Sequence, residues 1–313
     1  MKDLVSIADF NSESFNSLIR DAIEMKHDGW RDILDRKILA LLFEKPSLRT
    51  RVSFEVAMRQ LGGTTIYLSP AEVGLGRRES IPDIARVLSR YVNIIAARTF
   101  THQTVEELAR YSDVPVINAL SDQEHPCQAL ADIMTIIEKK GDPKKLTLAY
   151  IGDGNNVASS LLLATSFTGM NFRIAAPPGY MVPDRYLQLA KDFAIESGTE
   201  IFCTEEPRQA VQNADVVYTD TWTSMGQESE TEQRRKIFAD YQINSELLSF
   251  ARPDAIIMHC LPAHHGAEVA AGILDSPNSV VFDQAENRMH AQKALIARLL
   301  GGLEIPLAGC RPI

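Results

Sequence analysis

Short apolar runs alternate along the chain with stretches in which apolar residues recur every three or four positions. The short runs predict buried strands, and the longer periodic stretches predict helices with one buried face. The predicted strands lie at residues 38–43, 64–68, 92–97, 114–119, 146–151, 172–176, 200–203, 215–219, 255–258 and 280–282. Because these strands alternate with helices, we expect an α/β fold made of mainly parallel sheets flanked by helices.

The run Gly141-Asp142-Pro143 interrupts this alternation near the middle of the chain. Glycine and proline together favour a turn, and a chain of 313 residues is long enough for two domains. We therefore predict one domain over residues 1–141 and a second over residues 142–285, each built on its own sheet. We expect the active site in the cleft between them.

Composition and charge narrow the classes of partner. The formal net charge of −9 argues against a nucleic-acid partner, although a local cluster of arginines can still bind a small anion. No apolar run is long enough to span a membrane, and no targeting segment is visible at the N-terminus. The four cysteines are scattered, which favours reduced thiols and a cytoplasmic location.

A candidate anion site lies where the strand at 38–43 joins the next helix. This join carries Ser47, Arg49, Thr50 and Arg51. Free N–H groups at a helix start attract anions, and hydroxyl and guanidinium groups strengthen such a site for a phosphate or carboxylate. The alternative is an ordinary helix cap with two solvated arginines.

Reactive side chains also follow the predicted strands at their carboxyl ends. These residues are Arg49, Arg98, His125, Asn156, Asp220 and Cys260. Ligands of open parallel sheets bind at this edge, and two such edges facing each other would form a cleft between domains. His125 opens a helix with Gln128 one turn later, so both side chains can face a ligand there, unless His125 is only a helix-start residue.

Two other kinds of site receive weaker support. Gly152-x-Gly154 follows a strand as in dinucleotide-binding folds, but Val157 stands where the third glycine would be. The group His259, Cys260, His264 and His265 could bind a metal, yet its spacing matches no ordinary zinc pattern. Cys260 alone could equally be a small buried apolar residue. We expect neither a metal nor an organic cofactor.

Together, five motifs resemble the aspartate/ornithine carbamoyltransferase family, in the order that the family has them. They are Phe-x-Lys-x-Ser-x-Arg-Thr-Arg-x-Ser-Phe-Glu at 43–55, His-Pro-Cys-Gln at 125–128, the Asp-Thr-Trp-Thr-Ser-Met-Gly run from 220, His-Cys-Leu-Pro at 259–262 and Asn-Arg at 287–288. The Ser-Met-Gly and His-Cys-Leu-Pro runs are similar to those of the ornithine-specific members. The resemblance implies transfer of a carbamoyl group from carbamoyl phosphate to L-ornithine, giving citrulline and phosphate in arginine metabolism.

The resemblance also implies roles for individual residues. Carbamoyl phosphate would contact Ser47, Leu48, Arg49, Thr50, Arg98, His125, Pro126, Cys127, Gln128, Cys260, Leu261 and Arg288, and L-ornithine would contact Asn156, Asp220, Ser224 and Met225. Arg49, Arg98, His125 and Cys260 would be the catalytic residues. The C-terminal helix, residues 286–313, would return to the first domain, and the chain would assemble as a homotrimer or a multiple of one.

Some positions depart from the family pattern: Leu48 replaces a usual threonine, Gly74 lies where ornithine-type relatives often have a nearby glutamine, and the run 158–160 lacks a frequent histidine. The loop 72–80 is either a surface turn or a lid that reaches a neighbouring subunit. Two alternatives remain: a carbamoyltransferase for another amine, such as putrescine or an N-acylated ornithine, and a non-catalytic ligand-binding homologue.

Overall fold

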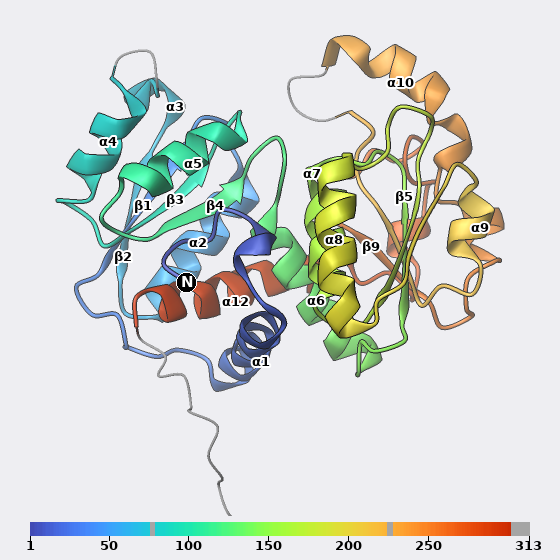
Figure 1. Ribbon diagram of the computed structural model, residues 1–313, viewed down its shortest axis with the longest axis horizontal. Coiled ribbons are helices and arrows are strands. Elements are labelled where there is room, and N and C mark those ends of the chain that lie inside the picture. The colour runs from blue at the N-terminus through green and yellow to red at the C-terminus, as the bar shows by residue number, and fades with distance from the viewer. Residues whose placement is uncertain (76–78, 224–227, 302–313) are drawn as a thin grey trace, which may run out of the picture.

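The computed structural model of the chain describes residues 1–75, 79–223 and 228–301, which form two sheets flanked by helices (Figure 1). The first sheet has the order β2-β1-β3-β4, with β1 (Ile38–Phe43), β2 (Thr64–Leu68), β3 (Ile94–Arg98) and β4 (Val116–Leu120). The second has the order β7-β6-β5-β8-β9, with β5 (Thr147–Ile151), β6 (Asn171–Ala175), β7 (Ile201–Thr204), β8 (Val216–Thr219) and β9 (Ile256–His259). The strands pair in parallel throughout, which confirms the predicted α/β class.

Helices connect the strands and cover the sheets. They are α1 (Ser12–Asp28), α2 (Leu48–Gln60), α3 (Pro70–Val73), α4 (Ile81–Leu88), α5 (His102–Tyr111), α6 (Pro126–Lys140), α7 (Asn156–Ser166), α8 (Asp184–Ser197), α9 (Pro207–Val211), α10 (Thr231–Ile237), α11 (Ser245–Leu248) and α12 (Val281–Leu299). Short 3₁₀ helices lie at Ile7–Asp9, Glu228–Glu230, Ala239–Tyr241 and Ile273–Asp275. None of the helices in the described ranges is long and apolar enough to cross a membrane.

The central strand β1 and the helix after it show how the sequence determines local structure. Residues 39–43 are buried, as expected for a parallel strand covered on both faces. Ser47 then caps α2, because its Oγ accepts the N–H of Thr50 at 3.3 Å. The turn between β1 and α2 therefore places the residues of the candidate anion site at the carboxyl edge of the first sheet.

The last helix, α12, packs against α1, α2 and α6, which belong to the first half of the chain (Figure 1). Lys293, fully buried on α12, donates from Nζ to the carbonyl oxygens of Met25 at 2.7 Å and Gly29 at 2.9 Å. These carbonyls are at the end of α1, where a cation also interacts favourably with the helix dipole. These hydrogen bonds attach α12 to α1 and so bring Arg288, about one and a half turns earlier on α12, to the first sheet.

One predicted strand, residues 280–282, is wrong. Ser279 forms an isolated bridge with Ile257, and Val280 donates its N–H to the Ile257 carbonyl at 3.0 Å, but α12 begins at Val281. The Val280-Val281-Phe282 run resembles a buried strand only in its apolar composition. Phe282 is in fact 73% exposed, and the buried positions that follow have helical spacing.

A continuous apolar core joins the two halves. The same cluster contains Leu41 of β1, Leu130 of α6, Leu162 of α7 and Tyr150 of β5. Helices α6 and α7 pack directly against each other between the sheets. These two helices therefore link the sheets through one shared apolar cluster.

Candidate active site

A cleft of about 970 Å³ lies between the carboxyl edges of the two sheets. All six side chains that were predicted at strand ends line it: Arg49, Arg98, His125, Asn156, Asp220 and Cys260. The strand register explains why they meet. Ile151 of β5 pairs with Thr219 of β8, which in turn pairs with His259 of β9, so the residues after these strands leave the sheet side by side.

Three arginines form the cationic wall of the cleft. Thr50 Oγ1 accepts from Nη2 of Arg288 at 3.0 Å and from Nη1 of Arg98 at 3.5 Å. Arg49 donates from Nη2 to the Leu261 carbonyl at 2.8 Å, across the cleft. Burial lowers the pKa of Arg98 to about 10, and repulsion from the Arg288 and Arg49 cations adds to this. Such a crowded group of guanidinium ions favours a bound anion with two or more charges.

Arg51 does not join this cluster, contrary to the expectation for the anion site. Its Nε donates to Glu55 at 2.8 Å, and its guanidinium group lies 3.9 Å from the centre of the Tyr67 ring. Arg49 and Arg51 are two positions apart on α2, so they point to different sides of the helix. The expectation was wrong for Arg51 because residue type and proximity in sequence did not account for this rotation.

His125 and Gln128 lie at the start of α6 and face the same cleft. Within the described ranges, Nδ1 of His125 and Oε1 of Gln128 have no hydrogen-bond partner although both atoms are buried. Burial lowers the pKa of His125 well below its usual value, and the cations of Arg288 and Arg98 act in the same direction. His125 is therefore neutral near pH 7, so it can donate one hydrogen bond without carrying a charge.

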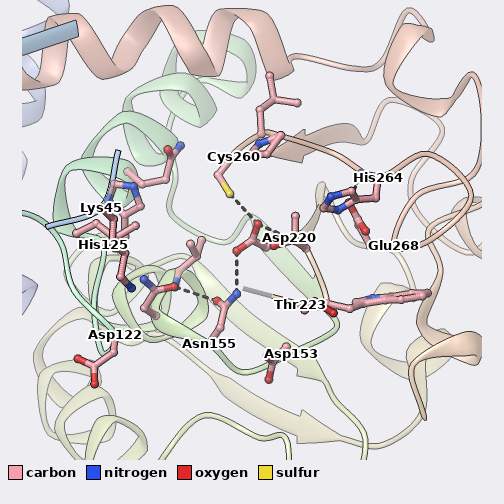
Figure 2. Close-up of a pocket in the computed structure, with 18 of the residues that line it drawn as sticks. Lys45, Asp122, His125, Asp153, Asn155, Asp220, Thr223, Cys260, His264 and Glu268 are labelled. Carbon is pink, nitrogen blue, oxygen red and sulfur yellow. Dashed lines mark hydrogen bonds and ion pairs between the residues drawn. The ribbon is translucent and has the colours of Figure 1, made fainter. Parts of the chain in front are cut away.

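Asp220 is the anionic centre on the opposite wall (Figure 2). Its Oδ2 accepts from Asn155 Nδ2 at 2.8 Å, and its Oδ1 accepts from Cys260 Sγ at 2.9 Å and from the Thr221 N–H at 2.7 Å. Burial raises the pKa of the Cys260 thiol well above its usual value, and the Asp220 carboxylate adds to this. Cys260 is consequently a thiol that donates a hydrogen bond, and its chemistry does not favour a covalent nucleophile.

The loop after β9 is held from behind by a buried histidine. Nδ1 of His259 accepts the N–H of Leu261 at 2.8 Å, which leaves Nε2 to bear the proton and donate to Glu268 at 3.3 Å. Ligand atoms of Asp220, His259 and Cys260 lie within 4.8 Å of one another and could in principle hold a metal. In this structure the same atoms already take part in hydrogen bonds, and His264 and His265 are not part of that group.

The remaining predicted residues occupy different surroundings. Asn156 donates from Nδ2 to the Ser121 carbonyl at 2.7 Å, across the cleft. Leu48 lies at the mouth of the cleft with its side chain 79% exposed. Lining residues also include Ser47, Gln128, Leu261 and Arg288, whereas Thr50, Pro126 and Cys127 are buried behind the cleft surface. Ser224 and Met225 lie outside the described residues, as do Arg77 and Arg78 of the 72–80 loop.

Two groups that the sequence reasoning missed also shape the site. Asn155 caps α7 with its Oδ1 while its Nδ2 holds Asp220. Arg234 of α10 donates to Asp153 at 2.8 Å and to the Trp222 carbonyl at 2.9 Å, so it fixes the residues next to Asp220. The N-cap pattern could have revealed Asn155, since asparagine before a helix favours that role. Arg234 has no comparable local signal.

Two family models together match nearly the whole chain. The model described as "Aspartate/ornithine carbamoyltransferase, carbamoyl-P binding domain" matches residues 2–138, and the one described as "Aspartate/ornithine carbamoyltransferase, Asp/Orn binding domain" matches residues 144–299. The chain therefore belongs to the aspartate/ornithine carbamoyltransferase family.

Within this family, the chain is similar to proteins named as ornithine carbamoyltransferases. The one from Thermococcus kodakarensis is 52% identical over 310 residues, covering 97% of this chain and 98% of that protein. The one from Bacillus subtilis is 51% identical over 299 residues, covering 96% of this chain and 94% of that protein. The solved structure of the Pyrococcus furiosus ornithine carbamoyltransferase superposes with a TM-score of 0.93 at 51% identity, covering 97% of this chain and 98% of that one.

Proposed function

We propose that the protein is an ornithine carbamoyltransferase, which converts carbamoyl phosphate and L-ornithine into L-citrulline and phosphate. The observation that carries this proposal is the charge arrangement of the cleft. The guanidinium groups of Arg49, Arg98 and Arg288 line one wall, where they can bind a phosphate, and the Asp220 carboxylate lines the other, where it can bind an ammonium group. The two substrates can therefore lie side by side and react directly.

On the first wall, Ser47, Arg49 and the N–H groups at the start of α2 bind the phosphate, and Thr50 holds the Arg98 and Arg288 guanidinium groups in place. Pro126 and Cys127 contribute the backbone start of α6. His125 and Arg98 polarise the carbamoyl oxygen and stabilise the charge that develops on it. Gln128 accepts a hydrogen bond from the carbamoyl amino group through its free Oε1.

On the second wall, Asp220 binds the ornithine α-ammonium and Asn156 binds the α-carboxylate, with Ser224 and Met225 completing the site. Cys260 and Leu261 lie on the path of the δ-amine, which must be neutral to attack the carbamoyl carbon. An unperturbed amine of this kind has a pKa of about 10. We assign residues 1–141 and 286–313 to the carbamoyl-phosphate domain and residues 142–285 to the ornithine domain, although α12 begins at Val281 and not at the predicted residue 286.

The acceptor specificity tests this assignment. We expect kcat/KM for L-ornithine to exceed that for putrescine, N-acetylornithine and L-aspartate by about 10⁴, because each of these leaves a buried polar group unpaired or does not fill the site. Citrulline formation, or release of phosphate for the other amines, is the measurement. Equal turnover of putrescine would contradict the role of Asp220 and Asn156, and turnover of no amine would indicate a ligand-binding homologue.

We also propose a homotrimer or a multiple of it. Leu48 and Val52 lie one turn apart on α2 with exposed side chains, and Ile66 is exposed on the edge strand β2. An apolar group beside the mouth of the cleft favours contact with another subunit. Light scattering should give a mass three times that of the chain, or a multiple of this. A mass equal to that of a single chain would contradict the assembly.

The cellular location that we propose is the cytoplasm. Among the described residues, Cys127, Cys203 and Cys260 are free thiols. Free thiols that serve as hydrogen-bond donors are best maintained in a reducing compartment. Cell fractionation tests this proposal, and recovery of the protein in an oxidising compartment would contradict it.

A further inference from the structure

Asp132 is a buried carboxylate that none of the roles above uses. It is fully buried on α6, one turn after Gln128, and lies behind the cleft without lining it. Its Oδ1 lies 2.8 Å from Nε2 of Gln128 and 2.7 Å from Nε2 of Gln284, and its Oδ2 lies 3.1 Å from the Tyr218 hydroxyl. Burial raises the pKa of this carboxyl group to about 7, and a polar group buried this deeply is costly unless it is hydrogen-bonded.

The direction of these hydrogen bonds can be deduced from a backbone group. The N–H of His259 can only donate, and it lies 3.0 Å from Oε1 of Gln284, so the other end of that amide, Nε2, faces Asp132. Oδ1 of Asp132 is therefore an acceptor. An ionised carboxylate has no proton to donate, so the Gln128 atom that contacts the same oxygen is then the nitrogen, and Oε1 of Gln128 is turned toward the cleft.

We propose that Asp132 is a positioning residue that sets the polarity of the Gln128 amide and so makes the site selective for a carbamoyl group. An acceptor oxygen in the cleft recognises the amino group of carbamoyl phosphate. It has no partner on acetyl phosphate, which has the same carbonyl and phosphate groups but a methyl group in place of the amine. This inference rests on the proposed function, since it concerns the same carbamoyl site.

Without the carboxylate, the Gln128 amide can rotate and present Nε2 to the cleft. A donor at that position does not pair with the carbamoyl amino group, so the binding of carbamoyl phosphate weakens. The binding of acetyl phosphate changes little, because its methyl group has no hydrogen bond to lose. Selectivity for carbamoyl phosphate over acetyl phosphate is therefore the property that reports on Asp132. If Asp132 had a purely structural role, its loss would weaken the binding of both ligands equally and leave the ratio of their dissociation constants unchanged.

The test compares the dissociation constants of carbamoyl phosphate and acetyl phosphate by calorimetry in three variants. Asp132→Ala should reduce the preference for carbamoyl phosphate about tenfold. Asp132→Asn should keep the preference within about twofold, because its Oδ1 can still accept from both glutamines while its Nδ2 donates to Tyr218. Thr135→Ala is the matched control, since Thr135 is buried on the same helix and accepts from Asn287 outside the cleft.

An unchanged preference in Asp132→Ala, or a lost preference in Asp132→Asn, would overturn the proposal. If the alanine variant does not fold, neutron diffraction of the deuterated wild-type protein decides the matter. Deuterons between Gln128 and Asp132 would have to belong to the Gln128 amide, and an amide oxygen facing Asp132 would contradict the inference. Failure of the proposed function is distinguishable, because the wild-type protein would then bind carbamoyl phosphate no better than acetyl phosphate.

Discussion

Substitution of Arg49 by alanine is expected to abolish measurable binding of carbamoyl phosphate. Arg49 lies at the start of α2 and reaches across the cleft to the Leu261 carbonyl, so its removal takes away both a cation and a link between the walls. A guanidinium group facing a dianion forms strong charge-assisted hydrogen bonds. We expect kcat/KM for carbamoyl phosphate to fall by about 10³ or more, measured as citrulline formation.

Arg51→Ala is the matched control for this experiment. Arg51 lies on the same helix and has the same charge, but it pairs with Glu55 and stacks on Tyr67 away from the cleft. Its loss should change the affinity for carbamoyl phosphate by less than about threefold, because an exposed ion pair contributes little. An Arg51→Ala variant as defective as Arg49→Ala would show that helix stability, and not the guanidinium in the cleft, determines binding.

Substitution of Asp220 by asparagine should weaken the binding of L-ornithine by about 2–4 kcal/mol. The change keeps the size of the side chain and an oxygen that accepts from Cys260 and the Thr221 N–H, but it removes the charge that pairs with the α-ammonium and replaces the oxygen that accepts from Asn155 with an amide nitrogen. The KM for L-ornithine in steady-state assays reports the effect. Asp122→Asn is the control, because Asp122 lies in the same cleft on the opposite wall and accepts the N–H of His102.

Asp122→Asn should leave the KM for L-ornithine within about threefold of wild type, since no ammonium group is assigned to that wall. Equal losses in the two variants would indicate that the overall negative potential of the cleft attracts ornithine. In that case Asp220 would have no specific pairing role.

The residues at the carboxyl end of each strand were predictable because their positions follow from local patterns alone. Apolar runs locate the strands, and the rule that ligands bind at the carboxyl ends of parallel strands brings Arg98, His125 and Asp220 together without knowledge of any distance. The same reasoning placed Cys260 at the carboxyl end of a strand, as it did Asp220. The pairing of Thr219 with His259 in the neighbouring strands β8 and β9 then brings the two residues side by side.

Contacts that depend on three-dimensional packing were not predictable. The rotation of α2 separates Arg49 from Arg51, and only the packing of that helix on β2 and α12 determines it. Gln284 is another example, since it bonds both Asp132 and the His259 N–H from a helix whose first turn was predicted as a strand. Its role requires three segments to meet that are far apart in sequence.

Titration of carbamoyl phosphate into the Asp220→Asn variant tests most directly whether the two walls of the cleft bind different substrates. We expect a dissociation constant within about threefold of the wild-type value, because the altered charge lies on the wall assigned to ornithine. Arg49→Ala, titrated in parallel, should show no binding. A loss of carbamoyl phosphate affinity in Asp220→Asn as severe as that in Arg49→Ala would contradict this division of the cleft.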